Sequence, residues 1–263
     1  PFRAGTLRRT VLLSSQTALL RMAAALDSLQ ADPYGGTEQR ISLARAELAM
    51  RRFRDVLMLG GRLDRLDRDV AETLALLAKS TDESGQVSFW PGSKSYVFLT
   101  AWSVQFLVEA RDAGYRIDDD LLARQTAALG QALRSDSTQL VSDLAYAERL
   151  WSLTALVQAG KADDAYAAEL AHRSQWLDLE SLAQVTAALG QSAATDPATL
   201  DALMTRVWAG IVTRLYQGRE VYGGLRGNAL AGNALILPSE SRTLAQVLRT
   251  VAARPDEAKG QLL

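Results

Sequence analysis

The sequence predicts an all-α fold of repeated helical hairpins, and three observations support this. Apolar residues recur at helical spacing in one segment after another. The helical segments are joined by short turns that contain glycine, and period-two alternation typical of strands is nearly absent. With 263 residues, 48% of them hydrophobic, the chain can bury a large core. Because no Pro-, Ser- or Gly-rich linker divides it, we expect one helical domain.

The elements follow one another in a simple order. Residues 7–13 are the best strand candidate, and residues 1–14 are interpreted as a lead-in strand or linker from a preceding domain, with the helical domain spanning 15–263. The predicted helical stretches are 19–29, 41–57, 70–78, 96–113, 118–134, 137–159, 163–172, 177–190, 197–216 and 239–253. The long irregular stretch 80–95 contains Phe89 and Trp90, which we expect to be buried.

Local signals mark several helix ends. Asp118–Asp120, Asp163, Asp196 (before Pro197) and Ser239 stand where a side-chain oxygen can accept N–H groups of a first helical turn. The string TAALGQ occurs at 126–131 and again at 186–191. Together with the regular helix–turn–helix spacing, this repetition favours repeated hairpins over an irregular bundle.

Charge and residue counts exclude several classes of protein. The formal net charge is -1, from 29 basic and 30 acidic residues, which excludes nucleic-acid binding driven by bulk charge. No cysteine is present, so disulfides, thiolate metal sites and cysteine nucleophiles are excluded. One histidine cannot build a zinc site, and His172 is expected to be a cation at an exposed helix C-terminus. We therefore expect no metal and no cofactor.

The most informative stretch is Asp32–Gln39, with the sequence DPYGGTEQ, at the start of the second long helix. It resembles the thioester domain of the alpha-2-macroglobulin family, specifically of its bacterial members, which carry Pro-Tyr-Gly-Cys-x-Glu-Gln here. Residues 11–29 look like the family's strand and first helix. Residues 85–115, which include FWPG and EARDAGY, resemble its Gly–Trp segment and the long helix that follows.

One departure from the family pattern decides the chemistry, because Gly36 stands where the family has its cysteine. A thioester joins that cysteine's sulfur to the side-chain carbonyl of a glutamine three residues later. Without the sulfur, Gln39 keeps an ordinary amide and covalent capture is not available. The resemblance therefore implies a vestigial thioester motif and no catalytic residue. The motif consists of Tyr34, Gly35, Gly36, Thr37, Glu38 and Gln39.

Read from the residues alone, the same stretch is a turn followed by a helix N-terminus. Gly35 and Gly36 would permit a positive φ, and Glu38 would lie near the positive end of the helix dipole.

The resemblance implies an alpha/alpha toroid, with an inner ring of helices packed against an outer ring. Because the chain ends soon after its tenth predicted helix, we expect a last hairpin to lie outside this segment and the ring to be open. The implied function is that of a non-catalytic domain of a bacterial, periplasmic, alpha-2-macroglobulin-like protease inhibitor. It would act by non-covalent trapping or partner contact. The implied partners are proteases, met through the full-length protein, neighbouring macroglobulin-like domains and other periplasmic proteins, with no nucleic acid and no small-molecule substrate.

Two other classes of function remain open. Asp118, Asp119 and Asp120 could serve an alpha/alpha-toroid enzyme such as a glycosidase, lyase or terpene cyclase, although helix capping explains the cluster without catalysis. The alternative is a helical scaffold with a groove for an extended peptide.

Overall fold

The computed structural model describes residues 30, 35–51, 53–55, 60–134, 146–192, 195–226 and 236–254. Their fold is mainly helical, as the sequence predicts. The helices are α2 (Thr37–Arg51), α3 (Gly60–Leu63), α4 (Leu66–Ser80), α5 (Val97–Asp112), α6 (Asp119–Arg134), α7 (Tyr146–Gln158), α8 (Asp164–His172), α9 (Leu179–Gly190), α10 (Pro197–Ala209) and α11 (Glu240–Ala252), with a 3-10 turn at Ser174–Trp176. Two antiparallel hairpins, β1 (Val87–Ser88) with β2 (Ser95–Tyr96) and β3 (Ile211–Tyr216) with β4 (Arg219–Leu225), complete the described elements.

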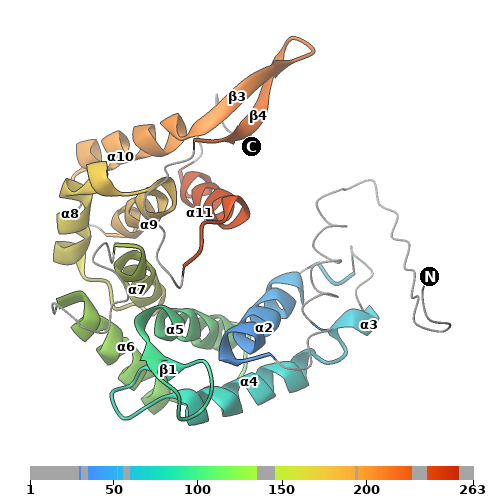
Figure 1. Cartoon of the computed structure of the whole chain (residues 1–263). Helices are drawn as coiled ribbons and strands as arrows, with labels where there is room; N and C mark the ends of the chain where they lie inside the picture. Colours follow the sequence, from blue (N-terminus) through green and yellow to red (C-terminus); the bar gives the residue numbers. More distant parts are fainter. Residues whose placement is uncertain are drawn as a thin grey trace, which may run out of the picture.

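The helices form two layers along an arc (Figure 1). The inner layer runs α2, α5, α7, α9, α11, and each helix packs on the next. The outer helices α4, α6, α8 and α10 cover them from outside, and the β3–β4 hairpin projects away from the helices at one end. The described inner and outer helices therefore alternate along the chain.

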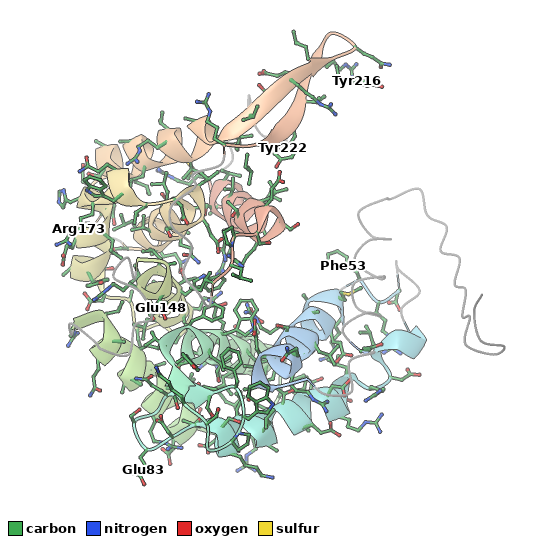
Figure 2. All side chains as sticks on the ribbon, in the orientation of Figure 1. Phe53, Glu83, Glu148, Arg173, Tyr216 and Tyr222 are labelled. Atoms are coloured by element: carbon green, nitrogen blue, oxygen red, sulfur yellow. The ribbon has the colours of Figure 1, made fainter. Side chains whose placement is uncertain are left out.

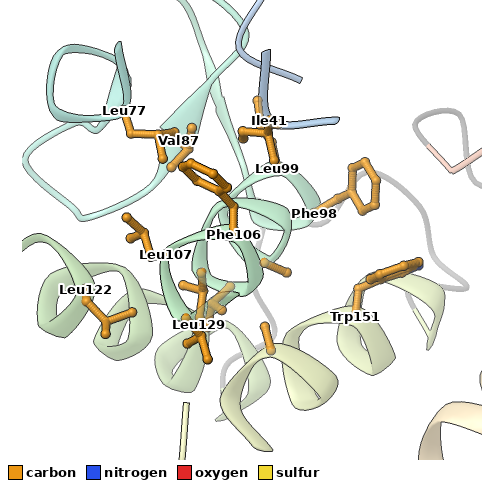
Figure 3. Packing of buried hydrophobic residues seen from close by; sticks show 14 of the residues in the cluster. Ile41, Leu77, Val87, Phe98, Leu99, Phe106, Leu107, Leu122, Leu129 and Trp151 are labelled. Carbon is orange, nitrogen blue, oxygen red and sulfur yellow. The ribbon is translucent and has the colours of Figure 1, made fainter. Parts of the chain in front are cut away.

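The core has two apolar clusters, one at each end of the arc. The first surrounds α5 and includes Ile41, Leu99, Phe106 and Trp151, all nearly or fully buried. In Figure 3, Phe98 from α5 and Trp151 from α7 lie close to each other, with the ring centroids 5.8 Å apart in an edge-to-face arrangement. The second cluster surrounds α9 and contains side chains of α7, α8, α10 and α11.

The predicted helix at 197–216 is wrong over its last seven residues, 210–216. Helix α10 stops at Ala209 with Gly210 at its C-cap, and β3 begins at Ile211. The β-branched residues Ile211, Val212 and Thr213 favour an extended chain. The two-residue turn Gln217–Gly218, with positive φ at both positions, suits the twist of a tight hairpin. Residues 222–225, which include two glycines, form the second half of β4.

Three further expectations, on the burial of Phe53, the burial of Trp90 and the repeated TAALGQ string, are corrected. Helix α2 ends at Arg51, so Phe53 does not continue its buried face and is 44% exposed. Trp90 is 61% exposed rather than buried, whereas its neighbour Phe89 is half-buried. The two TAALGQ strings lie on the outer helix α6 and the inner helix α9, so they do not occupy equivalent positions of a repeat.

The predicted caps at Asp163, Asp196 and Ser239 are confirmed, and Asp178 is a further cap that was not predicted. The carboxylates of Asp163, Asp178 and Asp196 accept N–H groups of the first turns of α8, α9 and α10, and Ser239 does the same for α11. None of the described helices has the length and apolar character required to cross a bilayer. The strand candidate at 7–13 and the boundary at residue 14 lie outside the described residues.

Two carboxyl groups meet in the interior between α2 and α4. Glu47 is fully buried and Asp69 is 2% exposed. The amide of Gln30 donates a 2.7 Å hydrogen bond to Glu47, and Arg65 lies 3.6 Å from Asp69. Burial raises the pKa of Glu47 to about 7. The neighbouring Asp69 adds to this rise, whereas the hydrogen bond from Gln30 opposes it. Glu47 therefore keeps its proton in the fold at mildly acidic pH.

We expect this carboxyl group to make stability fall as pH rises. The folded pKa lies above the ordinary value of 4.5, so the folded state binds more protons between about pH 4.5 and 7. The free energy of unfolding should then decrease across that window, by about 3 kcal/mol, and level off above it. Glu47→Gln should flatten this slope and raise the melting temperature at pH 8. An equally steep slope in the variant, measured by urea denaturation from pH 4 to 8, would contradict the assignment.

Candidate functional site

The N-terminus of α2 and the loop after β1 form one packed unit. The backbone N–H of Thr37 donates to the carbonyl oxygen of Phe89 at 2.9 Å. The Thr37 hydroxyl lies 2.9 Å from the same oxygen and 3.2 Å from the hydroxyl of Ser80 at the end of α4. The loop is therefore tied to the first turn of α2.

The same loop is anchored to α5 and α4. The N–H of Val87 donates to the Thr100 hydroxyl in α5 at 2.9 Å, and the Ser88 hydroxyl lies 3.0 Å from the Ser80 carbonyl oxygen. Phe89 packs edge-on against Tyr96, with ring centroids 5.4 Å apart. These contacts place the exposed ring of Trp90 beside the start of α2.

Gly36 lies directly under this loop and beside Gln39. A Cβ atom at position 36 would lie 3.1 Å from the Phe89 carbonyl oxygen, 3.3 Å from Oε1 of Gln39 and 3.4 Å from Cε2 of Trp90. Gly36 does not have a positive φ, so the expected backbone reason for glycine is wrong. Its lack of a side chain instead allows the close approach of the loop. A side chain here would point at the Gln39 amide.

The other motif residues are placed around this contact. Thr37 is buried, Glu38 is half-buried and Gln39 is exposed, while Tyr34 lies outside the described residues. Partial burial raises the pKa of Glu38, and the positive charge of Arg242 in α11 opposes that shift. The structure thus brings Gly36, Thr37 and Gln39 together with Phe89 and Trp90.

A second group of polar residues, missed by the sequence analysis, joins the inner helices to one another. Arg45 of α2 donates two hydrogen bonds to Glu109 of α5, at 2.7 and 2.8 Å, and its guanidinium lies 4.0 Å from the centre of the Trp102 ring. Arg242 of α11 donates a 2.7 Å hydrogen bond to Glu180 of α9. These acids of the inner layer are therefore held in ion pairs.

One signal for this group was present in the sequence. Glu38 and Arg45 on α2, and Trp102 and Glu109 on α5, are each seven residues apart, which places them on one helix face. Arg242 and Arg249 on α11 have the same spacing. What the sequence could not supply is which faces turn toward each other.

The aspartate cluster caps an outer helix. Oδ1 of Asp118 accepts the N–H groups of Asp120 and Leu121 at 3.0 and 3.1 Å, and all three aspartates are exposed. The capping interpretation is confirmed, and this geometry gives no support to an inward-facing acid pair. His172 ends α8 and is exposed, as expected. Among the described residues, no three His, Cys, Asp or Glu side chains group in a way that could hold a metal ion.

Comparison with solved structures shows a shared fold with bacterial alpha-2-macroglobulins. A Salmonella alpha-2-macroglobulin reacted with methylamine aligns over 92% of this chain with a TM-score of 0.70 and 20% identity. Native Escherichia coli alpha-2-macroglobulin, from domain MG7 to its C-terminus, aligns over 91% with a TM-score of 0.69 and 19% identity. The E. coli protein activated by porcine elastase aligns over 67% with a TM-score of 0.57 and 21% identity.

The chain spans only part of these proteins, namely 15%, 37% and 16% of their lengths in the same order. No sequence-family profile matches the chain, and no curated protein matches it by sequence. At this level of identity the likeness establishes the fold, and the function has to be argued from the site.

The capping role of Asp118 can be separated from a catalytic role by stability measurements. Asp118→Ala removes the acceptor for two N–H groups of α6 and should lower the free energy of unfolding by about 1 kcal/mol. Asp119→Ala is the matched control, because its carboxylate is not the cap acceptor, and it should change stability by about 0.3 kcal/mol or less. Equal losses in the two variants, measured by urea denaturation, would contradict the cap assignment.

Proposed function

We propose that this chain is the thioester-like domain of a bacterial alpha-2-macroglobulin-like protease inhibitor that has lost its thioester. In this proposal the inhibitor acts in the periplasm by non-covalent trapping of proteases or by contact with partners. The observation that carries the proposal is the placement of Gly36, at the start of α2 and under the Phe89–Trp90 loop, with its missing side chain facing Gln39.

The fold supports the proposal. The helical architecture matches bacterial alpha-2-macroglobulins over about nine-tenths of this chain. The residues DPYGGTEQ, which resemble the family's thioester motif, lead into α2. The exposed aromatic ring of Trp90 lies over position 36, where it would shield a reactive side chain at that position from part of the solvent.

The chemistry at this position supports the non-covalent form of the mechanism. A thioester needs a thiolate sulfur bonded to the Gln39 side-chain carbonyl carbon, with loss of ammonia. The chain contains no cysteine, so that carbonyl remains an amide, which does not acylate a lysine or serine at neutral pH. The site can contact a partner but cannot become covalently bonded to it.

The remaining options for inhibition are physical. E. coli alpha-2-macroglobulin has been solved after activation by trypsin and by elastase. By analogy, we propose that proteases meet the full-length protein and that neighbouring macroglobulin-like domains contact this helical domain. Proteolytic cleavage elsewhere in the protein would then rearrange domains around the protease, without a bond from this domain.

Methylamine tests the chemistry of the site directly, because it cleaves thioesters. The wild-type protein should show no mass change and release no thiol after incubation. Gly36→Cys provides the control, since its Cβ would lie 3.3 Å from the Gln39 amide oxygen.

We expect Gly36→Cys to form a thioester only in a minor fraction of molecules. The new Cβ would lie 3.1 Å from the Phe89 carbonyl oxygen, closer than side-chain carbons ordinarily approach, and Thr37 already binds that oxygen. Mass spectrometry and thiol titration before and after methylamine measure the fraction. A methylamide on Gln39 of the wild-type protein would overturn the account of this site.

Trapping is tested with the full-length protein and trypsin or elastase. Protease treated with excess inhibitor should lose most of its activity on a protein substrate but keep its activity on a small chromogenic peptide. Denaturing gels should show no adduct between the two proteins. Full activity on both substrates would remove the trapping function while leaving the assignment of the fold intact.

A further inference from the structure

The β3–β4 hairpin extends away from the helices and exposes large side chains at its far end. Leu215 is 80% exposed and Tyr216 is 59% exposed. Figure 2 shows Tyr216 at the tip of the hairpin and Tyr222 close to its base, where Tyr222 packs against the apolar cluster around α9. An isolated two-stranded hairpin is marginally stable in water, so an exposed one with apolar side chains at its tip suggests an interaction surface.

One face of this hairpin is basic and aromatic. In the antiparallel register Tyr216 lies opposite Arg219 and Arg214 lies opposite Val221. Opposite residues share a face, as do residues two apart, so Arg214, Tyr216 and Arg219 lie together, and all three are exposed. We refer to these three residues as the basic hairpin face.

The positive charge of this face is not neutralised within the described part of the chain. Neither Arg214 nor Arg219 forms an ion pair with another described residue. The one carboxylate on the two strands, that of Glu220, lies on the opposite face and accepts a hydrogen bond from the Thr213 hydroxyl. The face is therefore complementary to an acidic partner.

The outer edge of β3 is regular and can accept a further strand. The register shift between Val212 and Thr213 leaves Gly223 of β4 without an opposite residue, so the irregularity belongs to β4. Strand β3 contains neither glycine nor proline, and within the described chain it pairs only with β4. Its outward N–H and C=O groups resemble the edges to which other proteins add an extended peptide.

From this placement we propose that the hairpin binds an acidic, extended segment of another polypeptide, which adds as a strand to β3. Every second side chain of an added strand lies on the same side of the sheet as the basic hairpin face, and these side chains are spaced about 7 Å apart along the strand. Arg214 and Arg219 are separated diagonally by a similar distance, about 7–8 Å. An acidic residue of the partner opposite Arg214 would meet that guanidinium directly, and one two residues further on would lie opposite Tyr216, across which the long side chain of Arg219 on β4 can reach it. This inference rests on the hairpin alone and stands whether or not the chain is part of a protease inhibitor.

The binding test uses the whole 263-residue chain and a fluorescently labelled ten-residue peptide in which glutamate alternates with valine. Fluorescence anisotropy should show saturable binding. The double variant Arg214→Glu/Arg219→Glu should weaken it at least tenfold. The matched control, Arg116→Glu/Arg124→Glu, makes the same change of charge at exposed positions before and within α6 and should leave binding within twofold of wild type.

A second peptide separates strand addition from simple charge attraction. The same glutamate–valine sequence with N-methyl groups on alternate backbone nitrogens keeps its charge but cannot pair with β3, and it should not bind. Circular dichroism and melting temperature show whether each variant is folded, and Arg214→Gln/Arg219→Gln replaces the charge-reversed pair if that one is not.

Four results would overturn the proposal. They are no binding of the glutamate–valine peptide, equal loss in both double variants, undiminished binding of the N-methylated peptide, and tighter binding of a single-stranded oligonucleotide of equal charge. The last result would assign the basic hairpin face to nucleic acid instead.

Discussion

The burial of helix α5 on nearly all of its sides is the constraint on which the rest of the structure depends. Twelve of its sixteen residues are buried, and a helix that is apolar all round has to be enclosed by other elements. Helices α2, α4, α6 and α7 and the β1–β2 hairpin contact it. In the inner layer, α2 lies on one side of α5 and α7 on the other.

The geometry of the candidate site follows from that enclosure. Thr100 in α5 holds the N–H of Val87, so the loop that follows β1 has to run past the start of α2. Its Phe89 carbonyl oxygen then accepts from Thr37, and the space left at position 36 is that of a glycine. Position 36 and Gln39 lie close together, since a Cβ atom at position 36 would be 3.3 Å from the Gln39 amide oxygen.

The helices of the arc and the β3–β4 hairpin differ in how they are held. Between α2 and α5, and between α9 and α11, charged pairs such as Arg45–Glu109 and Arg242–Glu180 add to apolar packing. Both pairs are partly buried, so removing one partner costs more than removing the pair. The β3–β4 hairpin has no such ion pair among the described residues, and Leu215 and Tyr216 near its tip are exposed.

The sequence by itself determined the helical class, the positions of most helix starts, and the chemistry that is excluded. Capping residues such as Asp163 and Asp196 act within four residues of themselves, and the absence of cysteine needs no structure to interpret. The sequence-based prediction failed at Ile211–Tyr216, where the local preference for helix or strand is ambiguous. There the helix end at Gly210 and the Gln217–Gly218 turn make the segment a strand.

Only the tertiary structure decided which helix faces meet, that Trp90 lies exposed over Gly36, and that Arg45 pairs with Glu109. These contacts join residues far apart in the chain, so their energy depends on how α5 is enclosed rather than on any local pattern.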